Sequence, residues 1–151
     1  HDALPILKGY LLDTNVVSEL RKAGDGKADR AVMRWMRRQS NAGLFISVIT
    51  VLEIEFGILR IARRDVEQGA RLREWLHTRV LPEFAERTLS IDRDIALACA
   101  ALHVPNPRPE RDAWLAATAQ THGMTLATRN VADFVGMKVS LVNPWETSAA
   151  L

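Results

Sequence analysis

The stretch YLLDTNVVSEL, residues 10–20, decides the fold. Its apolar start, Tyr10–Leu12, predicts a buried β-strand, and this strand ends at the carboxylate of Asp13. Either Thr14 or Asn15 is a suitable N-cap for a short helix that would follow at once. A strand that passes directly into a helix is typical of α/β proteins, so we expect the chain to be built from such units.

Alternating strand and helix patterns continue along the chain and favour an α/β fold with about five parallel strands. Apolar runs between turn signals predict further strands at residues 44–48, 88–91, 125–128 and 138–142. Helical spacing predicts helices from about residue 29, through residues 51–61, and at residues 66–79, 95–102 and 112–122. Because no repeat or linker divides the chain, we expect a single domain over residues 1–151.

Composition agrees with one globular domain and argues against a membrane partner. Of the 151 residues, 48% are hydrophobic, which is enough for a full core. No stretch approaches the roughly 18 uninterrupted apolar residues of a membrane span. The start HDALPILKG is too short, and too interrupted by proline, for a secretory signal. Since the chain begins with His rather than Met, we interpret residues 1–8 as a tag remnant or a disordered extension.

Cysteine and histidine usage narrows the possible classes of site. The chain has one cysteine, Cys99, so no disulfide can form within it, and this fits a cytoplasmic protein. The four histidines are scattered and show no zinc-ligand spacing, which argues against a zinc enzyme.

Arginines gather in clusters around residues 34–38, 60–64 and 71–73. The net charge is only +2, but the sequence pI is about 9.0. The guanidinium group binds phosphate oxygens well, so a polyanionic partner is one interpretation. The alternative is that these arginines cover solvated helix faces and pair with nearby acids such as Glu67 and Glu74. Basicity alone does not decide between the two.

Four carboxylates, Asp13, Glu53, Asp112 and Asp133, are expected at one edge of the sheet. Strands joined by crossover helices run parallel, so their carboxyl ends share an edge, where open α/β sheets bind ligands. Two carboxylates about 5 Å apart repel by roughly 3 kcal/mol at an effective dielectric constant near 20. A cation would relieve this repulsion, and oxygen-only ligands favour Mg²⁺ or Mn²⁺.

Each of these acids also has an ordinary structural interpretation. Asp13 can cap the turn into the next helix, and Asp112 can stabilise a helix N-terminus through the helix dipole. Glu53 can be an exposed helix residue and Asp133 a turn residue. Glu53 and Glu55 lie about 200° apart around a helix, so both cannot face the site, and we predict that Glu53 is the inward one.

Four stretches of this chain resemble the PIN-domain family, and most closely its VapC-type toxins, including the FitB-like members. They are LLDTNVVSEL at 11–20, ISVITVLEIEFGI at 46–58, DAWLAATAQTHG at 112–123 and LATRNVADF at 126–134. They occur in the family order and span nearly the whole chain. Together they form a specific signature, whereas LLDTN alone would be weak evidence.

The resemblance implies a three-layer α/β/α fold with strand order 3-2-1-4-5 and the activity of a Mg²⁺- or Mn²⁺-dependent endoribonuclease toxin. It assigns the four acids to metal binding and catalysis. Supporting polar positions would be Asn15, Ser18, Thr128 and Asn130. It further implies an RNA substrate, a VapB- or FitA-like antitoxin whose segment covers the acids, a bacterial cytoplasmic location and a homodimer, which we expect to form through Trp35, Trp75 and their helices.

Two other function classes remain open, and a third is disfavoured. The chain can instead be a nuclease that acts on DNA, or a non-catalytic module that represses an operon through its antitoxin. A two-component receiver also uses clustered aspartates at strand ends. It requires a phosphoacceptor on the third strand, and residues 88–91 offer no aspartate before the capping residue Asp92.

Overall fold

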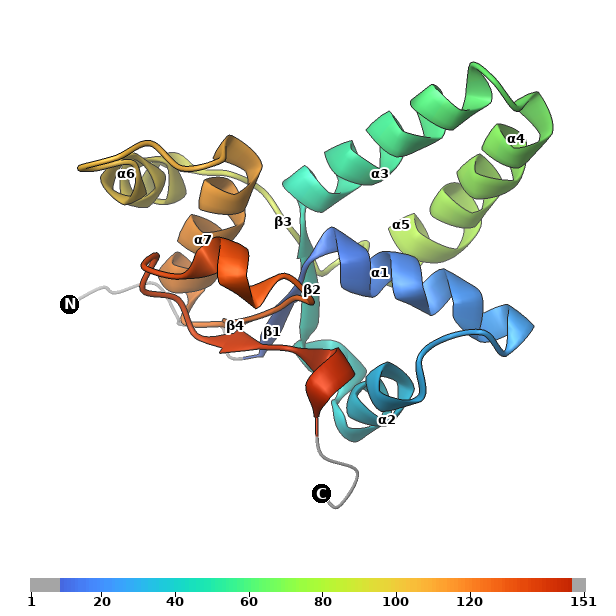
Figure 1. Ribbon diagram of the computed structural model, residues 1–151, viewed down its shortest axis with the longest axis horizontal. Helices are drawn as coiled ribbons and strands as arrows, with labels where there is room; N and C mark the ends of the chain where they lie inside the picture. The colour runs from blue at the N-terminus through green and yellow to red at the C-terminus, as the bar shows by residue number, and fades with distance from the viewer. Residues whose placement is uncertain (1–8, 148–151) are drawn as a thin grey trace.

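The computed structural model describes residues 9–147, so the interpretation of residues 1–8 lies outside the described part of the chain. Five parallel strands form one sheet in the order β3-β2-β1-β4-β5, which confirms the predicted order. In Figure 1, α6 and α7 cover one side of the sheet and α1 to α5 the other. The strands are β1 (Tyr10–Leu12), β2 (Leu44–Ser47), β3 (Thr88–Leu89), β4 (Thr125–Ala127) and β5 (Leu141–Val142).

Helices connect the strands, as the periodicity predicts. The longer ones are α1 (Thr14–Arg21), α2 (Arg30–Arg38), α3 (Val48–Ala62), α4 (Val66–Trp75), α6 (Arg93–Leu102) and α7 (Glu110–His122). A π-helical turn η3 (Leu76–Val80) continues α4 into the short α5 (Leu81–Glu83). Single 3₁₀ turns are η1 (Lys22–Asp25), η2 (Asn41–Gly43), η4 (Val131–Phe134) and η5 (Pro144–Glu146).

Consecutive residues of β1 face opposite layers, which is why the fold has two cores. Leu12 packs with Val16 and Trp35 on one side of the sheet. Leu11 packs with Leu115 of α7 and with the buried residues around Phe134 on the other side. Side chains alternate along a strand, so a continuous apolar run suits a strand that is buried on both faces.

Several boundaries differ from the predictions by a few residues, among them those of α7, β5 and β3. Helix α7 begins at Glu110, after the extended residue Pro109, so Asp112 lies within the first turn rather than at the helix start. Strand β5 begins at Leu141 rather than Lys138, and the left-handed backbone of Lys138, with φ of 55°, excludes that residue from an extended strand. Strand β3 ends at Leu89, two residues early.

Trp35 does not lie on a surface that a second copy can reach, so this part of the predicted dimer contact is wrong. The side chain is only 3% exposed and packs edge-to-face on Tyr10, with ring centroids 4.9 Å apart. Trp75 is partly buried against the same core. Helical spacing identified both as apolar positions, but it does not separate core from interface. Within residues 9–147, no helix is long and apolar enough to cross a membrane.

Gly69 sets the closest approach of the α3–α4 hairpin. A Cβ atom at Gly69 would lie 2.6 Å from the Cβ and 2.8 Å from the Cα of Ala62, whereas one at Gly57 would meet nothing within 4 Å. We predict that Gly69→Ala destabilises the fold by about 1–3 kcal/mol through overpacking. The matched control Gly57→Ala should be neutral or stabilising by about 0.5–1 kcal/mol, because it improves helix propensity.

Urea unfolding followed by circular dichroism checks this prediction. Equal midpoints for Gly69→Ala and Gly57→Ala would mean that the hairpin relaxes freely and that its spacing is not set at Gly69.

Candidate active site

Asp13 lies at the carboxyl end of β1 and is only 8% exposed. Its Oδ1 accepts the backbone N–H of Thr14 at 2.7 Å, which caps α1. Its Oδ2 accepts the hydroxyl of Thr128 at 2.8 Å and the amide of Asn15 at 3.4 Å. These contacts fix the carboxylate against the end of β4. Asp13 therefore does cap helix α1, as one interpretation of the sequence predicted, and this role is compatible with a second one.

The polar residues around Asp13 form a network across β1 and β4. The Thr128 hydroxyl accepts the backbone N–H of Asn130 at 3.0 Å, and Asn15 Oδ1 accepts the backbone N–H of Arg129 at 3.2 Å. Asn15 and Thr128 thus meet as side chains, while Asn130 joins through its backbone. Ser18 lies one turn further along α1, and within the described residues no hydrogen bond links its hydroxyl to this network.

Glu53 faces the site from α3, as predicted. Its Oε1 accepts the Thr14 hydroxyl at 2.6 Å, and its Oε2 lies 3.7 Å from the guanidinium of Arg111. Glu55 points away and pairs with Arg73 of α4 at 3.0 Å. Sequence reasoning missed Thr14 and Arg111. The polar character of Thr14 was visible but was interpreted only as a helix cap.

The pKa of Asp112 is affected by the charges of all three other acids. Burial, and then the negative charges of Asp13, Asp133 and Glu53, raise its pKa to about 6, while the positive charge of Arg108 lowers it. Four acids from distant parts of the chain therefore lie within one local electrostatic field.

The pKa of Asp13 is raised as well, and burial is the largest cause. Hydrogen bonds from Thr128, Thr14 and Asn15 pull this pKa back, and the charge of Glu53 adds to the rise. The buried carboxylate therefore has donors that favour its charged form but also a neighbour that repels it. A cation would cancel the repulsion by Glu53 and leave the hydrogen bonds to Asp13 intact.

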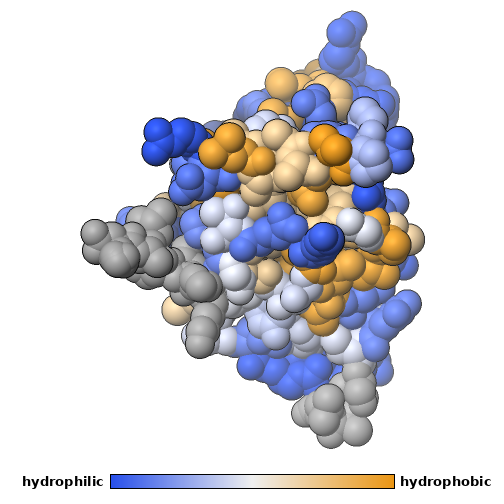
Figure 2. Space-filling model, turned by 90° about the vertical axis from the view of Figure 1, so that its left-hand side faces the viewer, coloured by the Kyte–Doolittle hydropathy of each residue, from blue (hydrophilic) through white to orange (hydrophobic). Residues whose placement is uncertain are grey.

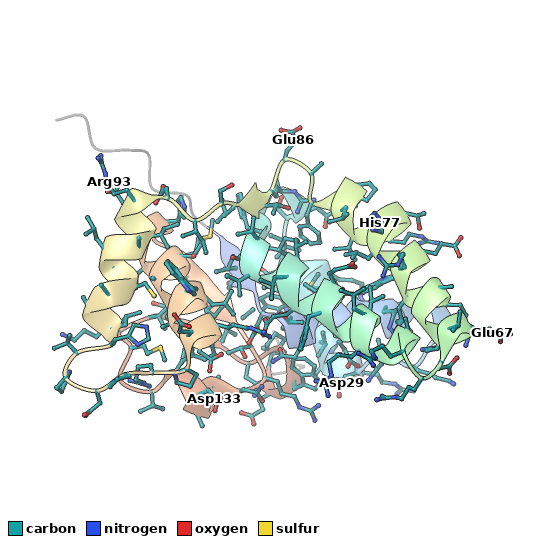
Figure 3. All side chains as sticks on the ribbon, turned by 90° about the horizontal axis from the view of Figure 1, so that it is seen from above. Asp29, Glu67, His77, Glu86, Arg93 and Asp133 are labelled. Carbon is teal, nitrogen blue, oxygen red and sulfur yellow. The ribbon has the colours of Figure 1, made fainter. Side chains whose placement is uncertain are left out.

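Asp133 is an exposed residue on η4, at the rim of the acidic group. Its backbone N–H bonds the carbonyl of Asn130 at 3.0 Å, so η4 continues directly from the polar network after β4. Figure 3 shows Asp133 at one margin of the molecule, whereas Glu67 and Glu86 lie at other margins. Exposure of this kind suits a residue that contacts a ligand through water.

The four acids have the ligand chemistry that a hard divalent cation requires. Their side chains do not yet surround a single point at which an ion could bind. Within residues 9–147, no three histidine, cysteine, aspartate or glutamate side chains are arranged so that they could hold an ion as they stand. All four donors are carboxylate oxygens, the type that Mg²⁺ and Mn²⁺ prefer. Burial is the largest cause of the raised pKa values of Asp13 and Asp112, and the charges of neighbouring acids add to it, so an ion would relieve this second effect. The residues therefore fit such an ion.

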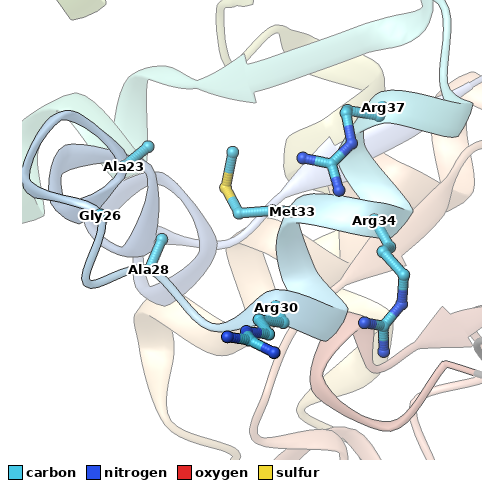
Figure 4. Close-up of a pocket in the computed structure, with 7 residues that line it drawn as sticks. All are labelled: Ala23, Gly26, Ala28, Arg30, Met33, Arg34 and Arg37. Atoms are coloured by element: carbon cyan, nitrogen blue, oxygen red, sulfur yellow. The ribbon is translucent and has the colours of Figure 1, made fainter.

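The arginines of these clusters have different surroundings. Arg73 is paired with Glu55, as the solvated-face interpretation expects. On α2, by contrast, Arg30, Arg34 and Arg37 line a hollow of about 430 Å³, which Figure 4 shows together with Met33. None of the four acids lines this hollow, so it is separate from the acidic group.

Comparisons with known proteins agree with this geometry. The PIN domain model matches residues 10–134, a span that contains all four acids. The chain is 37% identical to "VapC ribonuclease Y4jK" of Sinorhizobium fredii, covering 90% of this chain and 97% of that protein. It is 31% identical to "Toxin FitB" of Neisseria gonorrhoeae, covering 89% and 97%.

Solved structures show the same likeness. The crystal structure of FitAcB from Neisseria gonorrhoeae superposes with a TM-score of 0.81 at 30% identity, covering 91% of this chain and 99% of that one. A toxin-antitoxin complex from Klebsiella pneumoniae gives a TM-score of 0.65 at 29% identity, covering 92% and 100%. The matched model, the long relatives and the shared sheet order have one explanation: the chain belongs to the PIN domain family, among the VapC and FitB proteins.

Proposed function

We propose that this chain is a Mg²⁺- or Mn²⁺-dependent endoribonuclease and the toxin of a toxin–antitoxin pair. The observation that carries the proposal is the convergence of the acids: Asp13 is held by Thr128 and Glu53 by Thr14. Asp112 lies close enough to Asp13, Asp133 and Glu53 for their charges to add to the effect of burial on its pKa. Such a charge excess at one sheet edge destabilises the fold unless a cation uses it. The names of the relatives, a VapC ribonuclease and a FitB toxin, support this chemistry.

Each acid has its own part in the proposed reaction. Asp13 and Asp112 would hold the ion, with Asp13 kept in place by Thr128. Glu53 and Asp133 would bind it through water or orient the attacking water. When bound, the ion supplies charge neutralisation at the phosphate and at the leaving oxygen. In the proposed hydrolysis the water oxygen bonds to phosphorus and gives up a proton, while the bond from phosphorus to O3′ breaks and O3′ takes up a proton. The products therefore carry 5′-phosphate and 3′-hydroxyl ends.

An antitoxin partner and a bacterial cytoplasmic location belong to the same proposal. The similar Klebsiella chain is part of a toxin-antitoxin complex. We expect a small antitoxin to place a segment, with an arginine, over the acids. The similar "FitAB bound to IR36 DNA fragment" favours a second role in which the pair binds operator DNA. This regulatory role is compatible with catalysis and does not replace it.

The first prediction concerns substrate and products. With MgCl₂ or MnCl₂, the purified chain should cut labelled RNA and leave DNA of the same sequence intact, with 5′-phosphate ends at the cut. Gel electrophoresis with end-group analysis measures this. Cyclic-phosphate ends would contradict attack by water, and cleavage of DNA alone would favour the alternative nuclease.

Asp13→Asn is the control for metal dependence. It keeps the size of the side chain and removes one repelling charge, so the variant should fold and yet lose at least about a hundredfold in cleavage rate. Thermal unfolding supplies a second readout. Added MnCl₂ should raise the unfolding midpoint of the parent relative to EDTA and should not raise that of Asp13→Asn. Retained cleavage in the variant would remove Asp13 from the site.

The second prediction concerns stability and pH. The pKa of Asp112 rises from 3.8 to about 6 on folding, so between these values the folded state holds more protons than the unfolded one. In EDTA, stability should therefore increase as pH falls from 7 to 4. Asp112→Asn should reduce this pH dependence and stabilise the metal-free protein at pH 7 by about 1 kcal/mol, after allowance for solvent screening.

Urea unfolding at pH 4.5, 6 and 7.5 checks the pH prediction. Asp94→Asn, an exposed residue of α6, is the matched control and should follow the parent. If Asp112→Asn shows the same pH dependence as the parent, Asp112 is not the group that carries the excess charge.

The third prediction concerns the homodimer, for which the structure offers a surface other than Trp35. Figure 2 shows apolar side chains over the upper part of one face, where α6 lies. On α6, Leu97 is 66% exposed, and on α3, Leu52 is 49% exposed. We propose that a second copy covers α6. Sedimentation velocity should show a dimer, and Leu97→Glu should convert it to a monomer.

Val66 is the control for this experiment, because it is 76% exposed at the start of α4, beyond the far end of α3. Val66→Glu should therefore leave the dimer unchanged. A parent protein that stays monomeric at high concentration would contradict the proposed dimer.

A further inference from the structure

Arg111 lies between the acidic group and an exposed aromatic ring. It precedes Asp112 in the first turn of α7, and its Nη1 is 3.7 Å from Oε2 of Glu53 on α3. Its guanidinium carbon is 5.3 Å from the ring centroid of Phe56, which is one helical turn after Glu53. The side chain is 46% exposed, so the guanidinium borders both the acids and solvent.

The bond between Arg111 and Glu53 is weak by geometry. A separation of 3.7 Å is longer than a hydrogen bond, and the pair is partly exposed, so solvent screens it. The other oxygen of Glu53 already accepts the Thr14 hydroxyl at 2.6 Å, so Glu53 keeps its orientation without Arg111. The guanidinium can therefore leave Glu53 without releasing that carboxylate.

Two charges compete for Glu53. Glu53 would be neutralised by a divalent cation bound among the acids, and the positive charge of Arg111 would then be repelled. Phe56 keeps the guanidinium beside the site through a cation–π contact. A guanidinium that is freed at this position presents paired N–H donors, which match two oxygens of a phosphodiester.

We propose that Arg111 is a phosphate-binding residue of the active site, paired with Glu53 while no cation is bound and transferred to the backbone phosphate of single-stranded RNA once a cation takes Glu53. This inference rests on the proposed ribonuclease function. It assigns two opposite effects to one side chain: Arg111 opposes binding of the cation and favours binding of the substrate.

Arg60 provides a matched control on the same ring. Its guanidinium carbon is 5.5 Å from the Phe56 centroid, so it shares the aromatic contact of Arg111. Within residues 9–147, the ion pair with Glu53 belongs to Arg111 and not to Arg60. Loss of Arg60 therefore tests general effects of positive charge and ring contact, without the competition for Glu53.

The experiment compares Arg111→Gln, Arg111→Lys and Arg60→Gln in the full chain. Calorimetric titration with MnCl₂ measures cation affinity without any reaction, and steady-state cleavage of a labelled single-stranded RNA gives kcat and KM. Arg111→Gln should bind Mn²⁺ about threefold to tenfold more tightly and raise KM for RNA at least about tenfold. Arg111→Lys keeps the positive charge and loses the paired N–H donors of the guanidinium. Its Mn²⁺ affinity should therefore match that of the parent, while its KM for RNA should rise.

Arg60→Gln should leave Mn²⁺ affinity unchanged. Unchanged or weaker Mn²⁺ binding in Arg111→Gln, or an unchanged KM, would overturn the inference, because a merely structural Arg111 would not move the two quantities in opposite directions. If the parent binds Mn²⁺ but cleaves no RNA, the ribonuclease proposal fails together with the role assigned to Arg111. If the parent cleaves RNA, and Arg111→Gln has the same Mn²⁺ affinity and the same KM as the parent, the ribonuclease proposal stands and only the role assigned to Arg111 fails.

Discussion

The hydrogen bond from Thr128 to Asp13, at 2.8 Å, joins the ends of two strands that are 115 residues apart in the chain. It exists because β1 and β4 are neighbours in the sheet, with Leu12 beside Ala127 and the N–H of Asp13 bonded to the carbonyl of Ala127. A buried carboxylate is costly unless donors satisfy it. The pairing of β1 with β4 brings Thr128 to this carboxylate, and Thr14 and Asn15 at the start of α1 donate its other hydrogen bonds.

The site stores unfavourable electrostatic energy that the core must offset. Burial and neighbouring acids raise the pKa of Asp112 to about 6, so near neutral pH the folded chain keeps a charge that its surroundings disfavour. The two apolar layers on either face of β1 provide the opposing stability. A structural cap would not need this excess of charge, since one acid at a helix N-terminus is sufficient. The acids at this edge therefore exceed what helix capping requires.

The sequence predicted those features that follow from chain direction and local pattern. Parallel strands bring their carboxyl ends together, so the convergence of Asp13, Asp112 and Asp133 follows from the order of the elements. The choice of Glu53 over Glu55 follows from helix geometry. The start of α7 at Glu110 and the shortened β5 depend on the backbone angles of single residues, which pattern does not determine.

Side-chain contacts between helices were beyond prediction for a different reason. The approach of Arg111 to Glu53 depends on how α7 and α3 lie relative to each other, and no local period encodes that distance. Trp35 was uncertain for a similar reason. Its helical spacing fits a core residue and an interface residue equally well, and only its packing on Tyr10 shows that it belongs to the core. Composition was equally ambiguous for the arginines, where Arg73 has an acid partner and Arg37 lines a hollow.

Glu53 does not directly follow a strand, as Asp13 does, but lies on α3 more than one turn after the end of β2. Its direction depends on the rotation of α3 about its own axis. The burial of Ile54 and Ile58 in the core sets that rotation. The close approach of Ala62 to Gly69 and the Glu55–Arg73 pair join α3 to α4 in the same orientation. A helix turned by one residue, or about 100°, would point Glu53 away from Thr14. The α3–α4 hairpin, which contributes none of the other acids, is therefore part of what orients the site.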